Sequence, residues 1–425
     1  MLPNIKMDFR KEYKLIAQTP QIHFQASNTG AALRASEVKP KLDRYLIRRF
    51  TQAGTDYSKW LIPNQTKALD YKLRITPGED KRNGMTLQAR HSFDIFYGNT
   101  GASPDQKKEL IYRDCTLEVI CFYPELLETI NSCIGDFFIV TNFGTMQSKG
   151  FGSYTVDGWD NTEQHIVNTL FEDSGSLYCY QFQGRYKDGE PDLNRTFAAI
   201  KAVYALMKSG INLGRGRYQR GMLTYYAHEY NGSEPGFGNE KAWLKQNKLA
   251  PALCKHAQNP RNSQEDYNTS DETIFYIRAL LGVGDKLEFF KESLDPKDKA
   301  IVKVKCITAD PEKKDSTDKP LPLIERFPSP VRFKVIDNIV YYIAYPLDER
   351  ILDCEFQFTS EKYLNNKSMT LSTPTKEALG KNWQYVVEDF LLYCYEEFWE
   401  KDRAEYLKTF NDTNGIRISR WKNES

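Results

Sequence analysis

Apolar and polar residues alternate along the first part of the chain with two different periods. Runs with a period of two indicate strands, whereas apolar residues that recur every three or four positions indicate helices. The predicted elements are, in order, a strand at 12–19, a helix at 33–50, a hairpin of 71–76 and 85–98, a strand at 116–123, a helix at 124–135 and a strand at 136–143. This α+β order approximates a ferredoxin-like β-α-β-β-α-β domain with one added strand, whose sheet has one open face.

The second half of the chain continues this mixed pattern. Residues 193–210 form an amphipathic helix, because Leu193, Phe197 and Ile200 lie on one stripe. Further elements are predicted as strands at 176–183, 301–308 and 355–359, a pair of strands around Asp337-Asn338 and a closing helix at 382–407. We therefore expect two such domains, residues 1–190 and 191–425, with insertions in the second at 231–272 and 309–320.

Glycine becomes frequent after the strand predicted at 136–143. Gly144, Gly150 and Gly152 permit positive φ angles and leave backbone N–H groups unobstructed, so an anion such as a phosphate can approach closely. Ser148 and Lys149 add a hydroxyl and a positive charge. The alternative is a strand-loop-strand connection in which the glycines serve turn geometry alone.

The helix predicted at 33–50 carries an uneven charge pattern and has Ser36 as a candidate N-cap. Its polar face holds six basic residues and two acidic ones, Glu37 and Asp43, an excess of four positive charges. Such a face either is solvated and paired at i,i+4 or binds phosphate. The basic residues are Arg34, Lys39, Lys41, Arg44, Arg48 and Arg49.

A second basic segment follows the helix at 193–210. Arg215, Arg217 and Arg220 lie in a glycine-rich stretch, and no acidic residue occurs between 208 and 220. Because these charges have no compensating acid nearby, we interpret the segment as a loop that contacts a phosphate backbone. A solubilising surface turn is the alternative.

The composition narrows the classes of protein to consider. With 27% charged and 40% hydrophobic residues over 425 positions, the chain resembles an ordinary soluble protein with room for two or three domains. A net charge of +1 argues against an independent, non-specific DNA binder, so any nucleic-acid site must come from local charge. The eight cysteines are scattered and are expected to be reduced, buried, intracellular thiols.

Neither a signal peptide nor a membrane span is visible in the sequence. We therefore expect a cytoplasmic protein that engages no membrane. The five histidines have no second histidine or cysteine at metal-ligand spacing, and neither a phosphate-binding P-loop nor a hydrolase motif occurs. No cofactor and no metal site are expected.

Three stretches of the sequence carry recognisable motifs, namely TPQIHFQ with GAALRASEVKPKLDRYLI, FGTMQSKGFGSY and RFPSPVRFKV. Together they resemble the RAMP superfamily of CRISPR effector proteins. TPQIHFQ followed by GAALRASEVKPKLDRYLI is similar to the family's opening strand, loop and basic helix start. FGTMQSKGFGSY looks like its glycine-rich loop, and RFPSPVRFKV is similar to its R-x-x-S-P-v strand. The resemblance spans roughly residues 10–360 and is dense at these three places, which occur in the family's order.

The resemblance implies an RNA-binding subunit built from ferredoxin-like folds, in a type III (Cmr- or Csm-like) CRISPR interference complex that acts in antiviral defence. The implied partners are CRISPR guide RNA, target RNA or both, and other type III effector subunits. The family's target-cleaving aspartate aligns with no Asp of this chain, so no catalytic residue is carried over. The residues predicted to bind RNA are Arg34, Ser36, Lys39, Lys41, Arg44, Gly144, Ser148, Lys149, Gly150, Gly152, Arg215, Arg217 and Arg220.

A metal-independent endoribonuclease that processes CRISPR transcripts is the alternative function. Such an enzyme needs a general base and a general acid beside the scissile 2′-hydroxyl, and His23 with a tyrosine or lysine could supply them. His23 follows the first predicted strand between Ile22 and Phe24, a position typical of a structural histidine. We therefore favour a non-catalytic subunit.

Overall fold

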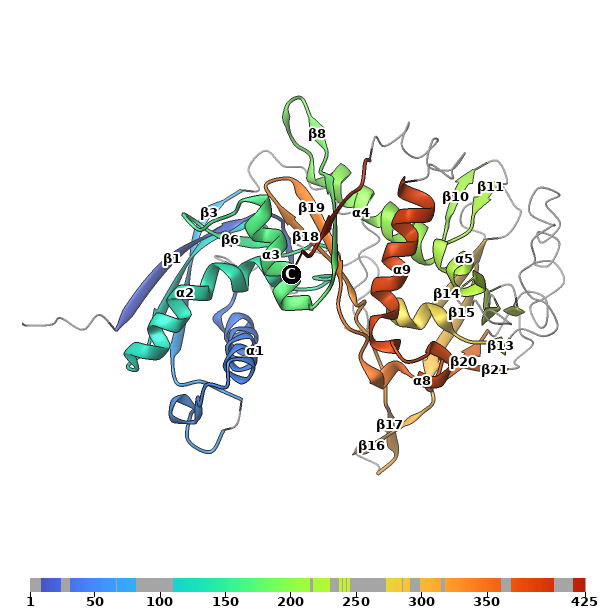
Figure 1. Ribbon diagram of the computed structural model, residues 1–425, viewed down its shortest axis with the longest axis horizontal. Coiled ribbons are helices and arrows are strands. Elements are labelled where there is room, and N and C mark those ends of the chain that lie inside the picture. The colour runs from blue at the N-terminus through green and yellow to red at the C-terminus, as the bar shows by residue number, and fades with distance from the viewer. Residues whose placement is uncertain are drawn as a thin grey trace, which may run out of the picture. The chain divides into compact units, whose positions relative to one another are not determined.

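The chain is divided into two compact units that interleave along the sequence (Figure 1). The first unit comprises residues 1–200, 332–343 and 416–425, and the second comprises residues 201–331 and 344–415. The computed structural model describes residues 9–23, 31–65, 67–81, 110–214, 217–229, 237–238, 240–241, 243–244, 273–284, 286–290, 299–314, 318–360, 368–400 and 416–424.

A four-stranded antiparallel sheet in the order β3-β5-β1-β6 is the centre of the first unit. The strands are β1 (Arg10–Ala17), β3 (Lys72–Asp80), β5 (Arg113–Ile120) and β6 (Tyr154–Val156). In the chain, helix α1 (Ala35–Gln52) lies between β1 and β3, and α2 (Pro124–Val140) lies between β5 and β6. A third helix, α3 (Glu163–Ser174), follows β6.

The period-two pattern of β1 decides which face of this sheet becomes core. Tyr13, Leu15 and Ala17 are buried, whereas Glu12 before them and Lys14 among them are exposed. The buried face joins the apolar stripes of α1 and α2 in one hydrophobic cluster. Burial of such side chains stabilises the fold by about 1.5–3 kcal/mol each.

A second antiparallel sheet of the first unit, in the order β18-β19-β7-β22, gathers strands from distant parts of the sequence. They are β7 (Tyr178–Gln183), β18 (Val331–Ile336), β19 (Ile339–Ala344) and β22 (Ser419–Lys422). Strands β18 and β19 are joined through Asp337 and Asn338, whose φ angles of 48° and 59° are those of a two-residue hairpin turn. The turn predicted at these residues is therefore confirmed.

Short pairs and one long helix complete the first unit. Helix α4 (Leu193–Lys208) begins in it, and the division between the units falls after Ile200. The short antiparallel pairs are β2 (Gln21–Ile22) with β4 (Leu110–Ile111) and β8 (Tyr186–Lys187) with β9 (Glu190–Pro191), and a 3-10 turn covers Ser58–Trp60.

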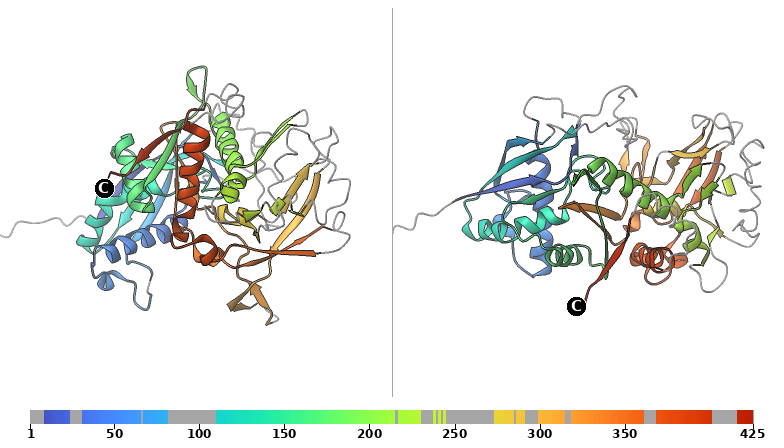
Figure 2. Two further views of the ribbon diagram at one scale, coloured as in Figure 1. Left: turned by 45° about the vertical axis from the view of Figure 1, so that its right-hand side comes forward. Right: turned by 90° about the horizontal axis from the view of Figure 1, so that it is seen from above.

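The second unit has its own antiparallel sheet, in the order β14-β15-β20-β21. Its strands are β14 (Lys286–Phe290), β15 (Lys299–Cys306), β20 (Glu355–Thr359) and β21 (Ser368–Ser372). The ring of Tyr276 packs edge-on against Phe356 and Phe358 on the buried face of this sheet. Figure 2 shows the sheet from two further directions.

The remaining elements of the second unit are short pairs and helices. The pairs are β10 (Ile211–Gly214) with β11 (Arg217–Gln219), β12 (Phe237–Gly238) with β13 (Thr273–Ile274), and β16 (Ala309–Lys314) with β17 (Pro320–Pro322). The helices are α5 (Met222–Glu229), α8 (Lys376–Leu379) and α9 (Val386–Cys394), with 3-10 turns at Ile277–Leu281, Glu349–Ile351 and Trp383–Tyr385 and a π turn at Tyr395–Glu400.

The strand predicted at 136–143 is wrong, because α2 continues through this run to Val140. A continuous apolar run such as Phe137–Val140 fits a buried helix as well as a buried strand, so its periodicity does not separate them. Phe137, Phe138 and Ile139 are all buried in α2. The glycine-rich loop is therefore entered from a helix, and the strand that follows it is β6.

Three smaller expectations also changed. Ser36 is not the N-cap of α1, because Arg34 holds that position without a side-chain cap. The polar segment 309–320 contains β16, and the basic segment 208–220 contains β10 and β11. The strand predicted at 85–98, most of the insertion 231–272 and the end of the helix predicted at 382–407 lie outside the described residues.

The seven cysteines in the described part of the chain are free and buried, as predicted, and Cys254 lies outside it. None of the helices described here combines the length and apolar character that a membrane crossing requires.

Candidate nucleic-acid interface

The glycine-rich loop between α2 and β6 has a backbone that requires glycine at three positions. Gly144, Gly150 and Gly152 have φ angles of 80°, 84° and 69°, which side-chain-bearing residues rarely adopt. A Cβ added to Gly152 would lie 2.0 Å from the carbonyl oxygen of Phe143, so the backbone passes too close for any side chain. A close approach to these glycines was expected and is observed, but the group that approaches is the protein's own backbone and not an anion.

The backbone N–H groups of the three glycines donate within the protein. Gly150 donates to the carbonyl of Gln147 at 3.3 Å, and Gly152 donates to the carbonyl of Pro20 at 2.9 Å. The N–H of Gly144 donates to the Glu37 carboxylate of α1 at 2.6 Å. The cradle of open amides predicted here is thus not formed, and side chains must supply any contact to an anion.

Lys41 of α1 connects the helix to this loop. Its ammonium donates to the carbonyl of Asn142 at 2.8 Å and to the side-chain oxygen of Gln147 at 2.9 Å. It also lies 3.4 Å from the carboxylate of Glu37. Asn142 in turn donates to the carbonyl of Phe333 in β18 at 2.9 Å. Helix α1, the loop and β18 therefore meet around Lys41.

Five basic side chains gather around this meeting point, and we call them the basic patch. Burial lowers the pKa of Lys41, Glu37 opposes this shift, and the guanidinium groups of Arg44 and Arg332 lower the pKa further. Arg44 and Arg332 are exposed, and the ammonium of Lys149 lies 5.7 Å from the centre of the Phe333 ring. The patch consists of Arg34, Lys41, Arg44, Lys149 and Arg332.

Lys39, two residues before Lys41, serves the interior of the unit instead. Its ammonium lies 2.9 Å from the Asp43 carboxylate, donates to the carbonyl of Leu69 at 2.8 Å and lies 4.0 Å from the centre of the Tyr71 ring. Residues two apart point to different sides of a helix, so Lys39 and Lys41 diverge.

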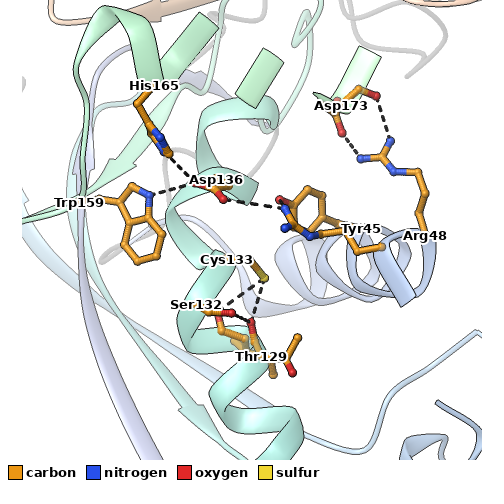
Figure 3. A network of polar contacts seen from close by, with 11 residues as sticks. Tyr45, Arg48, Thr129, Ser132, Cys133, Asp136, Trp159, His165 and Asp173 are labelled. Atoms are coloured by element: carbon orange, nitrogen blue, oxygen red, sulfur yellow. Dashed lines mark hydrogen bonds and ion pairs between the residues drawn. The ribbon is translucent and has the colours of Figure 1, made fainter. Parts of the chain in front are cut away.

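The basic residues at the end of α1 belong to a polar network that binds this helix to α2 and α3 (Figure 3). Arg48 pairs with Asp173 of α3, and Arg49 donates to the hydroxyl of Tyr45 at 2.9 Å. The carboxylate of Asp136 lies 3.0 Å from His165 and 3.1 Å from the indole nitrogen of Trp159. Arg48 is therefore neutralised by a contact with another helix, whereas the i,i+4 pairs that the alternative anticipated are Lys39 with Asp43 and Lys41 with Glu37.

The other predicted contact residues have separate locations. Ser36 is exposed near the start of α1, and Ser148 accepts the N–H of Phe333 through its carbonyl at 3.1 Å. Arg217 lies in β11 and Arg220 follows it, both in the second unit. Arg215 lies outside the described residues.

His23 lies beside the basic patch and is 8% exposed. Burial lowers its pKa, the charge of Arg34 lowers it further, and Glu37 partly opposes the shift. Its surroundings therefore favour the neutral imidazole over the charged form. A side chain so little exposed fits the structural role that the sequence favoured.

Two residues of β18 were missed as functional candidates although their motif was noticed. Arg332 belongs to the basic patch, and Lys334 is buried, with its ammonium donating to the carbonyl of Phe138 at 2.6 Å. The alternation in RFPSPVRFKV predicts a strand, but the strand's partners are distant in sequence. No pattern in the local sequence could show that the side chains of Arg332 and Lys334 lie beside α1 and α2.

Comparison with known proteins gives two family matches. The Cmr1 N-terminal domain matches residues 8–211, and the Cmr1 C-terminal domain matches residues 218–415. A solved structure, the crystal structure of Cmr1 from Pyrococcus furiosus in its apo form, is 12% identical and covers 46% of this chain and 71% of that chain, with a TM-score of 0.29. A likeness at that TM-score supports no structural argument. None of the curated proteins matches.

The two family matches follow one another in the order of the family's domains, and only residues 212–217 separate them. They also agree with the three RAMP-like stretches of the sequence. The chain therefore belongs to the Cmr1 family of RAMP proteins, the subunits of type III CRISPR complexes.

Proposed function

We propose that this chain is an RNA-binding subunit of a Cmr-type effector complex and that the basic patch contacts the RNA backbone. The observation that carries the proposal is the cluster of positive charge around Lys41, because Arg44 and Arg332 are exposed and their guanidinium groups add to burial in lowering the pKa of Lys41. Like charges held this close are costly to the protein alone and favour a polyanionic ligand. Guide RNA, target RNA or both are the proposed ligands.

A ferredoxin-like domain is the proposed scaffold of the first unit. The sheet order β3-β5-β1-β6, with every neighbouring pair antiparallel and α1 and α2 as the two connections, supports this assignment. The two compact units support a two-domain organisation. We propose that the first domain is formed mainly by the residues before the boundary near residues 190 and 191. Residues 332–343 and 416–425 come after that boundary in the sequence but complete the first domain in the fold.

The predicted contact residues take different parts in this proposal. Arg44 and Arg332, which are exposed, contact phosphates directly, whereas Arg34, Lys41 and Lys149 add positive charge behind them. Gly144, Gly150 and Gly152 shape the loop, Ser148 ties it to β18, and Lys39 holds α1 against the residues that follow it. Ser36 and the second-unit residues Arg215, Arg217 and Arg220 are proposed as further contacts along the RNA.

Fluorescence anisotropy of the purified full chain with a labelled oligouridylate tests the patch. Arg44 and Arg332 are both exposed, so the double variant Arg44→Gln/Arg332→Gln should fold normally. We expect binding to weaken about tenfold and the slope of log K against log salt to fall by about 1.4, since each lost phosphate contact on a single strand accounts for about 0.7.

Lys59→Gln is the matched control, because Lys59 is an exposed lysine of the same unit paired with Glu125. Its affinity and salt slope should equal those of the wild type. Equal slopes for the double variant and the wild type would exclude the patch as the binding surface. Cleavage of a CRISPR repeat RNA without metal, abolished by His23→Ala, would instead establish the endoribonuclease.

A further inference from the structure

Two cysteines of the second unit lie beside each other at the place where β15 and β20 separate. Cys306 is the last residue of β15 and pairs in register with Phe356 of β20. Cys354 lies two residues before Phe356 and therefore on the same, buried side of the sheet. The two cysteine side chains interact directly, and this interaction is the largest influence on the pKa of each. We call Cys306 and Cys354 the thiol pair.

The surroundings of Cys306 stabilise a thiolate. Its sulfur accepts hydrogen bonds from the backbone N–H groups of Ile324 and Thr308 and from the hydroxyl of Thr308. That hydroxyl in turn accepts the N–H of Glu355 at 2.8 Å. A contact with the Thr308 carbonyl, which would favour the protonated thiol, is long at 3.8 Å. The interaction with Cys354, together with these donors, holds the pKa of Cys306 below its ordinary value in spite of burial.

Cys354 has the opposite surroundings. Its thiol donates to the carbonyl of Arg350 at 3.0 Å and lies 3.4 Å from the carbonyl of Leu352. Carbonyl oxygens favour the protonated thiol, and the interaction with Cys306 and burial both raise the pKa of Cys354. One member of the thiol pair is therefore arranged as a nucleophile and the other as the thiol that resolves its oxidised form.

The other buried cysteines in the described part of the chain behave differently. Burial is the main influence on each of them, and it raises their pKa. Such thiols are inert, because the thiolate is the reactive form. These five residues are Cys115, Cys121, Cys133, Cys179 and Cys394.

We propose that the thiol pair is a reversible oxidation site, at which a hydroperoxide converts Cys306 and Cys354 into a disulfide. The Cys306 thiolate attacks one oxygen of hydrogen peroxide, the O–O bond breaks, and the departing hydroxide takes up a proton to become water. The sulfur of Cys354 then attacks the sulfenic acid of Cys306, and its proton leaves with the hydroxyl group as a second water. Two thiols are oxidised by two electrons while one peroxide is reduced to two waters.

The disulfide is feasible because the pairing of β15 with β20 ends at the thiol pair. The register ends at Cys306 and Phe356, and beyond it the N–H of Ile307 donates to the carbonyl of Glu355 at 2.9 Å. Diagonal neighbours on one face of a sheet have Cα atoms about 7–8 Å apart, whereas a disulfide needs less than about 7 Å. The end of β15 must therefore shift by about 1 Å, which the end of a ladder permits more easily than its middle.

The position of the thiol pair also gives the disulfide a structural consequence. Cys306 itself is 2% exposed, but the next residue, Ile307, is 42% exposed, so the pair lies close to the surface. Strand β16 begins at Ala309, three residues after Cys306, and its hairpin with β17 extends away from the sheet of this unit (Figure 1). Oxidation would therefore fix the base of this hairpin. The inference does not depend on RNA binding.

Peptide mapping of the full chain after treatment with hydrogen peroxide tests the thiol pair. Trypsin cleaves after Lys305 and after Arg350, so the two cysteines fall in separate peptides, 306–313 and 351–362. We expect these peptides to become joined with the loss of two hydrogens and to separate again in dithiothreitol. The link should form at least about tenfold faster than Cys394 is oxidised, since burial raises the pKa of that thiol.

Three variants separate the two roles. In Cys354→Ser the sulfenic acid of Cys306 has no resolving thiol, so dimedone should label Cys306. In Cys306→Ser, Cys354 should stay unlabelled at the same peroxide concentration. Cys394→Ser is the matched control, because it removes another buried thiol of the same unit, and it should keep the link between the two peptides.

Melting curves will verify that the three variants are folded, and the map of the wild type depends on none of them. If the two peptides stay separate in the wild type while Cys394 is oxidised, the inference is wrong. Labelling of Cys354 in the Cys306→Ser variant would also overturn it, because the roles would then not be those assigned. RNA binding by the reduced chain is measured separately and decides the proposed function alone.

Discussion

At the scale of single residues, two buried lysines show how an ammonium can serve the fold. Lys334 donates to the carbonyls of Phe138 and Thr141, at 2.6 and 3.0 Å, and so provides a donor for carbonyls at the C-terminal end of α2. Burial lowers its pKa well below the ordinary value, and the charge of Lys41 lowers it further. Lys334 thus fixes the point where the glycine-rich loop leaves the helix.

Lys208 in the second unit predicts a pH-dependent stability. Its ammonium donates to the carbonyl of Gly282, and burial is the main cause that lowers its pKa from 10.5 to about 7. Between these two values the unfolded chain binds more protons than the folded one, so the free energy of unfolding rises with pH, by at most about 1.4 kcal/mol per unit. That contribution is lost as the pH falls toward 7.

Urea unfolding between pH 7 and pH 8.5 measures this contribution, because the cysteines, whose ordinary pKa is about 8.5, titrate in wild type and variant alike and cancel in the comparison. Lys208→Met should give a flatter rise of stability with pH than the wild type. Lys201→Met, on the same helix and exposed, should keep the wild-type slope. A Lys208→Met slope equal to that of the wild type would contradict the assignment.

At the scale of elements, the glycine-rich loop owes its form to contacts with three neighbours. The hydroxyl of Thr19 donates to the carbonyl of Gly150 at 2.7 Å, and the ring of Phe151 stacks on Phe197 with centres 3.9 Å apart. The hydroxyl of Ser153 donates to the carbonyl of Val335 in β18 at 2.7 Å. The loop is therefore a packed element whose Lys149 ammonium lies over the ring of Phe333 in β18.

Two glycines with similar φ angles test how tightly the loop is packed. Gly158 has a φ of 73° and open space at its Cβ position, whereas Gly152, at 69°, has the Phe143 carbonyl 2.0 Å away. Gly158→Ala should cost about 1–2 kcal/mol for the left-handed backbone alone. Gly152→Ala should cost about 1–3 kcal/mol more, because the backbone must move.

Chemical denaturation of both variants gives the comparison directly. Because Gly152 and Gly158 have similar φ angles, the difference between the two losses of stability measures the steric cost of a Cβ at Gly152. Equal losses of stability for Gly152→Ala and Gly158→Ala would mean that the loop can open without cost. RNA affinity measured on the same samples should fall for Gly152→Ala more than for Gly158→Ala.

At the scale of the whole molecule, the first unit is completed by the end of the chain. Strand β22 pairs with β7, with Arg420 opposite Tyr180 and Trp421 opposite Cys179. The guanidinium of Arg420 also lies 5.1 Å from the centre of the Tyr178 ring. Residues more than two hundred positions apart in sequence therefore share one sheet.

Deletion of residues 416–425 should destabilise the first unit selectively. The deletion removes the ladder on one side of β7, so the amides among residues 178–181 that face β22 should exchange with solvent at least about tenfold faster. Hydrogen exchange read by mass spectrometry compares this variant with the full chain. The substitution Lys422→Gln keeps the strand and should leave the exchange unchanged. Unaltered protection of β7 in the deletion variant would show that β22 contributes nothing to the sheet.

Local periodicity was a good guide to elements whose partners lie nearby in sequence. The strand of β1, the helices α1 and α4 and the hairpin turn at Asp337-Asn338 follow from side-chain period and turn chemistry. The same reasoning failed at Phe137–Val140, where every residue is apolar and the period is hidden. It failed again for the glycine amides, because their acceptors are carbonyls that the sequence cannot locate.

The sequence by itself determined the class of the protein, since three short stretches and the basic pattern of α1 indicated a RAMP protein that the family matches bear out. Tertiary structure alone decided which charges meet. Lys39 and Lys41 look equivalent in sequence. In the structure Lys39 pairs with Asp43, whereas Lys41 lies near Arg332, which belongs to the second half of the chain. The physical reason is that helical period sets the side on which a residue points, whereas only the folded chain brings a distant strand to that side.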